Sequence, residues 1–161
     1  MSNVLIGIIG VILFIGLALA GALFLGPRFQ ESTNNSKASA QVQAMQQIAN
    51  AIDMYRVQEQ GSVPDGISIG DTGSKQLTDG GYLKSVPKDA TGKGATFVPM
   101  VSGGNRYLLI GLQTKSVCQA VLRQVAGAAA AETIPASPDP TKNIGCYGSG
   151  TADQYLLTAK L

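Results

Sequence analysis

The hydropathy pattern is dominated by an uninterrupted apolar segment near the start of the chain. From Val4 to Leu25 the sequence contains 22 residues and no charged, amide or hydroxyl side chain. A helix of ~20 residues spans the ~30 Å hydrocarbon core of a bilayer, so this segment is long enough to cross a membrane. A cleavable signal peptide is the alternative, but its apolar core of ~7 to 15 residues would follow a basic side chain. No Lys or Arg precedes Val4, and we therefore predict a retained transmembrane helix.

A second, amphipathic helical pattern follows the apolar segment. Between them lie Gly26 and Pro27, where we expect a kink rather than a break, because proline lacks an N–H and fixes φ. Apolar residues then recur at spacings of 4, 3, 4 and 3: Ala38, Val42, Met45, Ala49 and Ile52. Ile48 and Tyr55 widen the same apolar face of the helix. The residues between them predict a mostly uncharged polar face: Gln41, Gln43, Gln46, Gln47, Asn50 and Asp53. This helix should pack on its own head and end near Gln60, with Gly61 as a left-handed cap.

The rest of the chain predicts a head of the α+β class. Residues 62–94 indicate a long loop with a short helix over 74–80. Strands are expected over 95–101 and 106–112, joined by a hairpin turn at 102–105, and Pro99 places the first strand at a sheet edge. A helix over 114–127, an Ala/Pro-rich loop over 128–140 and a strand over 154–160 complete the head, and we expect Cys146 on the loop before this last strand. We expect two parts, a transmembrane helix (1–27) and an amphipathic helix with its antiparallel sheet (28–161).

Composition argues against several functional classes. The net charge is only +2, and the charges are scattered without the basic clusters that nucleic-acid binding requires. The chain has no histidine, the most common general base and metal ligand. Residues 66–70 match the Gly-x-Ser-x-Gly string of hydrolases, but Pro64 and Asp65 stand where a strand would precede it. We therefore predict no enzyme activity, no catalytic, metal or cofactor site and no specific nucleic-acid partner.

Two cysteines, Cys118 and Cys146, are the only ones in the chain. In a chain that begins with a membrane segment, they indicate a disulfide formed after export, with free thiols as the alternative. An oxidised head places the C-terminal part outside the membrane and the N-terminus inside.

The apolar segment is also rich in small residues, which allow helices to approach closely within lipid. They lie on several faces of the helix: Gly7, Gly10, Gly16, Ala18, Ala20, Gly21 and Ala22. Gly16 and Ala20, spaced four apart, could seat a neighbouring helix, although glycine is also common in membrane helices generally.

In its order of elements the chain resembles the type IV pilins, and most closely the type IVb group that includes the toxin-coregulated pilin. The likeness covers an apolar N-terminal helix, an amphipathic continuation through Met54-Tyr55-Arg56, a loop with Pro64 and a Cys-bounded C-terminal region. The segments 111–118 and 144–148 look like the flanks of that family's disulfide.

Two features differ from the pilin pattern. Pilins usually carry a glutamate a few residues from the mature N-terminus, where this chain has Leu5, and no acidic residue occurs before Glu31. No basic leader ending in glycine precedes Met1. If the leader has been removed, the resemblance implies that Met1 is the processed and N-methylated terminus.

The resemblance implies a helical homo-oligomer. Subunits would reside in the lipid bilayer of the inner membrane, then be extracted by inner-membrane assembly machinery into an extracellular surface filament for adhesion, aggregation or conjugative DNA transfer. In the assembled filament we also expect a melted turn within residues 10–16 or at Gly26-Pro27. The alternatives are a minor pilin, a secretion pseudopilin, or a solitary membrane-anchored binding protein.

Overall fold

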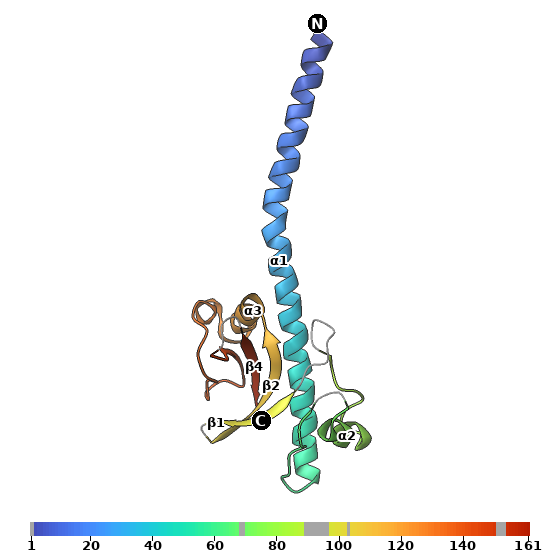
Figure 1. Cartoon of the computed structure of the whole chain (residues 1–161), viewed down its shortest axis with the longest axis vertical. Helices are drawn as coiled ribbons and strands as arrows, with labels where there is room; N and C mark the ends of the chain where they lie inside the picture. The colour runs from blue at the N-terminus through green and yellow to red at the C-terminus, as the bar shows by residue number, and fades with distance from the viewer. Residues whose placement is uncertain (1, 68–69, 89–96, 103, 151–153) are drawn as a thin grey trace. The chain divides into compact units, whose positions relative to one another are not determined.

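The computed structural model describes residues 2–67, 70–88, 97–102, 104–150 and 154–161. Its elements follow in chain order (Figure 1): α1 (Ser2–Gln58), α2 (Thr72–Asp79), β1 (Val98–Ser102), β2 (Asn105–Gln113), α3 (Lys115–Ala126), the 3₁₀ helix η1 (Ala128–Ala131), β3 (Ile144–Gly148) and β4 (Tyr155–Lys160). A long N-terminal helix and a four-stranded antiparallel sheet confirm the α+β class, in an architecture like that of pilins.

Helix α1 is continuous from Ser2 to Gln58, so Gly26 and Pro27 do not break it. By its internal contacts the chain divides into two compact units, Met1–Asn34 and Asn35–Leu161. We call the second unit the head. Whether Gly26 and Pro27 kink the helix stays a prediction.

The C-terminal end of α1 has a left-handed cap. Gly61 has a φ of 91°, as expected, but Gln60 is also left-handed, with a φ of 52°. The N–H of Gly61 donates to the carbonyl of Arg56 at 2.8 Å. This six-residue closure makes Gln60 the first left-handed residue of the cap, a position that usually favours glycine.

The sheet has the strand order β1-β2-β4-β3, with every neighbouring pair antiparallel. The pairing of Ser102 with Asn105 confirms the hairpin, and β1 is an edge strand, as Pro99 predicted. Residues 95 and 96 of the expected first strand lie outside the described residues.

Strand β3 corrects the expectation that Cys146 lies on a loop. Cys146 pairs with Leu157 of β4, and Gly145 pairs with Thr158. The Thr158 hydroxyl also donates to the Gly145 carbonyl at 3.2 Å. Two glycines in five residues obscure the strand in the sequence, since glycine is depleted in strands, and β3 owes its extended form to β4.

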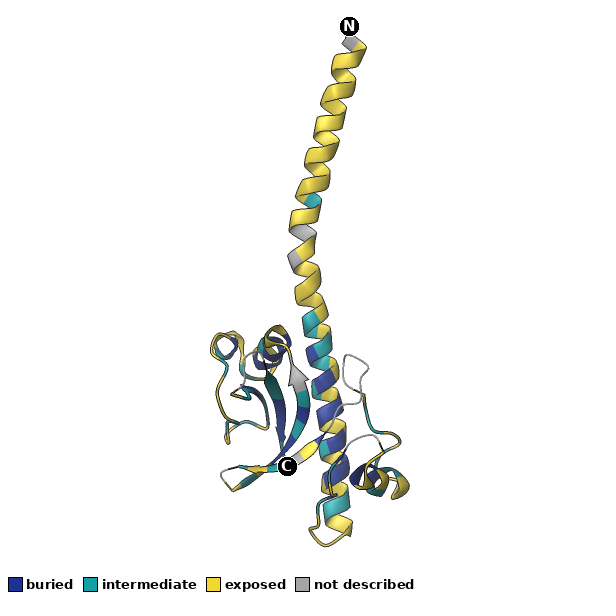
Figure 2. Ribbon diagram, viewed as in Figure 1, coloured by how far each residue is buried: buried dark blue, intermediate teal, exposed yellow. Residues whose placement is uncertain are grey.

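The core of the head lies between one side of α1 and the sheet, as the dark blue segments of Figure 2 show. Ala38, Met45, Ile48 and Ile52 of α1 are fully buried. They share the core with residues from α2, the sheet and its flanking loop: Leu77, Phe97, Leu108, Ile110 and Leu157. The amphipathic pattern of the sequence therefore correctly predicted which side of this part of α1 is buried.

Gln41 is an exception to the predicted polar face. Its side chain is only 1% exposed, whereas Gln43, Gln46, Gln47, Asn50 and Asp53 are exposed. Successive residues rotate by about 100° around a helix, so Gln41 falls between Met45 and Ile48 on the buried side. We assigned Gln41 to the polar face because of its residue type, although its position in the sequence already lies within the apolar side of the helix.

Candidate assembly surface and disulfide-bridged head

The described residues of the apolar part of α1 are nearly all exposed, as the yellow colour of this part of the ribbon in Figure 2 shows. Phe14 is 73% exposed and Leu23 75% exposed, and none of the most apolar window is buried within the chain. Among the described residues this is the one helix that is long and apolar enough to cross a membrane. Exposed apolar surfaces of this size mark sites of contact with lipid or with other protein.

The small residues of this segment fall on two opposite faces of the helix. At about 100° per residue, one arc of about 120° contains five of them: Gly7, Gly10, Ala18, Gly21 and Ala22. Gly16 and Ala20 lie within about 40° of each other on the other side. Apart from the neighbouring residues and the helix's own backbone, no described heavy atom lies within 4 Å of a Cβ position at Gly7, Gly10, Gly16 or Gly21. Both faces are therefore open to close approach by another helix.

The polar residues at the ends of this segment are sparse. Leu5, at the position where pilins usually carry glutamate, is an exposed apolar side chain. Arg28 is the first charged side chain and is exposed, and Glu31 follows. Met1 lies outside the described residues. The segment thus offers apolar and steric contacts to a neighbour rather than an ion pair.

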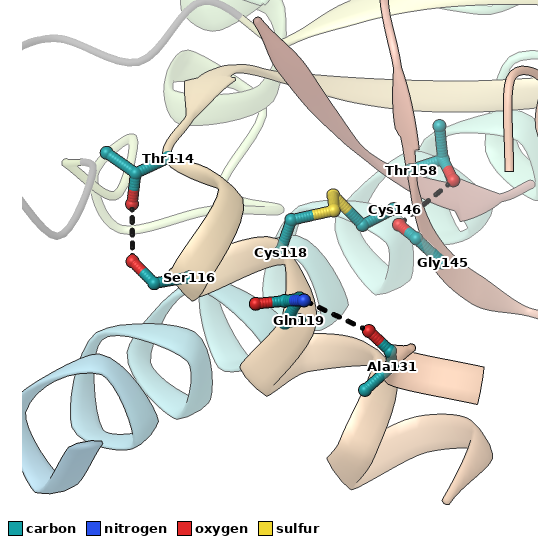
Figure 3. The surroundings of a disulfide bond; sticks show 8 residues. All are labelled: Thr114, Ser116, Cys118, Gln119, Ala131, Gly145, Cys146 and Thr158. Carbon is teal, nitrogen blue, oxygen red and sulfur yellow. Dashed lines mark hydrogen bonds between the residues drawn. A yellow bond between two sulfur atoms is a disulfide. The ribbon is translucent and has the colours of Figure 1, made fainter. Parts of the chain in front are cut away.

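A disulfide between Cys118 and Cys146 joins α3 to β3, as predicted (Figure 3). The two Cα atoms are 5.6 Å apart, and both cysteines are buried in the core. Gln119 of α3 also donates to the carbonyl of Ala131 at 3.3 Å, which holds η1 against α3. The disulfide is therefore a structural crosslink between a helix and an edge strand.

The loop before β3 is organised by Asp139. Its carboxylate accepts hydrogen bonds from the Thr141 N–H at 2.9 Å and the Thr141 hydroxyl at 2.6 Å, and lies 3.7 Å from the Lys142 ammonium. The hydrogen bonds from Thr141, followed by the Lys142 charge, lower the pKa of Asp139. Burial raises the pKa of Tyr147 in the neighbouring strand.

Within the part of the chain that the structure describes, no group of three or more His, Cys, Asp or Glu side chains could hold a metal ion. Of the Gly-x-Ser-x-Gly string, Ile67 is buried and paired with Phe97, while Ser68 lies outside the described residues.

Comparison with known proteins identifies no relative. No family model, curated protein or solved structure matches this chain.

The sequence analysis missed one residue that contacts α1 and assigned another to the wrong face. Gln124 of α3 donates through Nε2 to the carbonyl of Asn35 at 3.3 Å and to the hydroxyl of Ser39 at 3.0 Å. Gln41 is buried with neither amide atom partnered among the described residues. The helical spacing of Gln41 was a usable signal, but Gln124 and Asn35 are 89 positions apart and share no local pattern.

Proposed function

We propose that this chain is the structural subunit of a type IV pilus, similar to the type IVb group. The observation that carries the proposal is an exposed apolar helix with small residues on two opposite faces, running without interruption into a disulfide-bridged α+β head. In this role the subunit resides in the inner membrane and is then packed, helix against helix, into an extracellular filament.

The two small-residue faces favour a filament over a dimer. A helix that pairs with one neighbour needs one such face, as in small-xxx-small membrane dimers. A helix in the core of a filament is surrounded, and it must accept neighbours on more than one side. Gly16 with Ala20 on one side, and Gly7 with Gly10 and Gly21 on the other, meet this requirement.

The transfer from membrane to filament is also physically reasonable for this segment. Lipid tails and apolar helices are similar environments, so exchanging one for the other costs little. The helical backbone keeps its hydrogen bonds internal in both, except at the melted turn expected in the filament within residues 10–16 or at Gly26-Pro27. Since Leu5 supplies no charge near the N-terminus, docking of a new subunit would rely on shape and apolar contact.

The assembled filament would serve adhesion, aggregation or conjugative DNA transfer at the cell surface, and inner-membrane assembly machinery would drive its extension. Electron microscopy of sheared surface fractions, with immunogold labelling of this chain, tests the proposal. Abundant thin filaments labelled along their length are expected. Sparse labelling at filament ends would indicate a minor subunit, and a chain found only in membranes would indicate a solitary anchored protein.

Replacing Gly16 or Ala20 by Leu should reduce filament yield strongly while membrane insertion is unchanged, because a bulky side chain holds neighbouring helices apart. Leu19→Ile, an exposed apolar position outside both faces, is the matched control. Filament yields equal to wild type in both Gly16→Leu and Ala20→Leu would mean that this face has no neighbour.

A further inference from the structure

One stretch of α1, between its apolar segment and its head-packed segment, contains no apolar side chain. Every residue from Gln30 to Lys37 is polar, after the exposed Phe29 and before Ala38, which is fully buried in the head. Residues 30–33 are exposed, and the boundary between the two compact units falls after Asn34. Most helices in proteins depend on packing of an apolar face, and this stretch has no such face.

The composition of this stretch also disfavours a helix. Ser32, Thr33, Asn34, Asn35 and Ser36 are five consecutive residues of low helix propensity, because their short polar side chains compete for backbone groups. The structure contains this competition. The Thr33 hydroxyl donates to the Phe29 carbonyl at 2.9 Å, and the Ser39 hydroxyl donates to the Asn35 carbonyl at 3.0 Å. Such bonds to the preceding turn weaken and bend helices.

The head secures α1 where this stretch ends. Gln124 donates to both the Asn35 carbonyl and the Ser39 hydroxyl, so that a side chain of α3 secures the first turn of α1 within the head. Helix α3 is itself crosslinked to β3 by the disulfide. The attachment of Gln124 is thus made from a helix that is crosslinked to the sheet.

We propose that residues 30–36 form a hinge, in which the helix opens locally while the flanking parts of α1 stay helical. On the membrane side, lipid protects the backbone hydrogen bonds of the apolar segment. On the head side, Gln124 sets the limit of opening. The hinge does not depend on the pilus assignment, but in a pilus it would let the head reorient as its helix leaves the membrane.

Hydrogen exchange of the full chain in lipid nanodiscs tests this hinge. After correction for intrinsic rates, amides of residues 32–36 should exchange more than about 10-fold faster than those of residues 44–52, because local opening of residues 32–36 exposes no fully buried side chain. Equal protection of the two ranges would overturn the proposal.

A variant that strengthens the helix sharpens the test. Combining Ser32→Ala, Thr33→Ala, Asn34→Ala and Ser36→Ala should slow exchange in the hinge by about 10- to 30-fold, as expected from the summed helix propensities. The matched control, Gln43→Ala with Gln46→Ala and Gln47→Ala, changes exposed positions of the same helix outside the hinge. It should leave exchange at residues 32–36 unchanged, and equal slowing by both variants would contradict the assignment.

Gln124 is tested separately. Gln124→Ala should extend fast exchange to residues 37–39, with rates there rising about 5-fold for the loss of its hydrogen bonds. The exposed Lys115→Ala on the same helix is the control and should leave these rates unchanged. No change with Gln124→Ala would show that it does not limit the hinge.

The outcome for filaments is distinguishable from the outcome for the hinge. If wild-type cells form no filaments of this chain, the proposed function fails, while the exchange rates still decide the hinge. If filaments form, the four-alanine variant should insert into the membrane normally and yield fewer of them. Normal filament yield from a variant with slowed exchange would refute the role of the hinge in assembly.

Discussion

Replacing Gln41 by methionine should stabilise the head. The Gln41 side chain is 1% exposed, and neither Nε2 nor Oε1 has a hydrogen-bond partner among the described residues. Burying an unpartnered amide costs about 1 to 3 kcal/mol in mutational data. Methionine has a similar length and volume, so the loss from imperfect repacking should stay below about 1.5 kcal/mol. We expect the free energy of unfolding to rise by about 1 to 2 kcal/mol.

Urea unfolding of the full chain in mild detergent, followed by near-ultraviolet circular dichroism of the head tyrosines, measures this change. In thermal unfolding of the same protein, the midpoint should rise by about 4 °C per kcal/mol for a head of this size. Gln47→Met is the matched control, because Gln47 lies on the same helix but is exposed, and it should change stability by less than about 0.5 kcal/mol. If Gln41→Met lowers stability by more than about 1 kcal/mol while the control is neutral, the amide is hydrogen-bonded and the reasoning is wrong.

Three further predictions concern the head. Cys118→Ser or Cys146→Ser should cost about 3 to 4 kcal/mol of unfolding free energy, since the disulfide closes a sequence separation of 28; labelling of both thiols in native, unreduced protein would contradict this. Gln60→Gly should stabilise the end of α1 by about 0.5 to 1 kcal/mol, because glycine adopts positive φ without strain; Gln58→Gly, within the helix, should destabilise it in the same urea assay. The pKa of Asp139 in the folded head is lowered below its ordinary value of 3.8. The ionised Asp139 carboxylate therefore stabilises the head above pH 3.8, and this stabilisation is lost as the pH falls through the lower pKa of the folded state. Asp139→Asn should therefore flatten the loss of head stability below about pH 4, and an unchanged acid profile would refute the role of its hydrogen bonds.

Most of the candidate assembly surface is predictable from sequence, because its features are local. A run of apolar residues specifies a helix long enough for a bilayer, and helical rotation alone assigns Gly16 and Ala20 to one face. The hairpin at Ser102 and Asn105 is likewise specified by its own turn residues. Such features need no information from distant parts of the chain.

Strand β3 and the Gln124 attachment could not be predicted in this way. Residues 144–148 include two glycines and become a strand only through pairing with β4. In the sequence Gln124 is an ordinary polar residue of an amphipathic helix, and its hydrogen bond to Asn35 is visible only once α3 is placed beside α1. Both depend on contacts between segments far apart in sequence, which no local pattern encodes.

The placement of Gln41 depends partly on local sequence and partly on tertiary structure. Its spacing from Ala38, Met45 and Ile48 determined the side of α1 on which it lies, since helical geometry is the same in every protein. Only the packed head decided that this side is closed to water at Gln41 and that its amide is left unpartnered by the described residues. The sequence by itself determined orientation along each helix, whereas burial and hydrogen bonding were decided by the tertiary structure, because they depend on which distant side chains fill the remaining space.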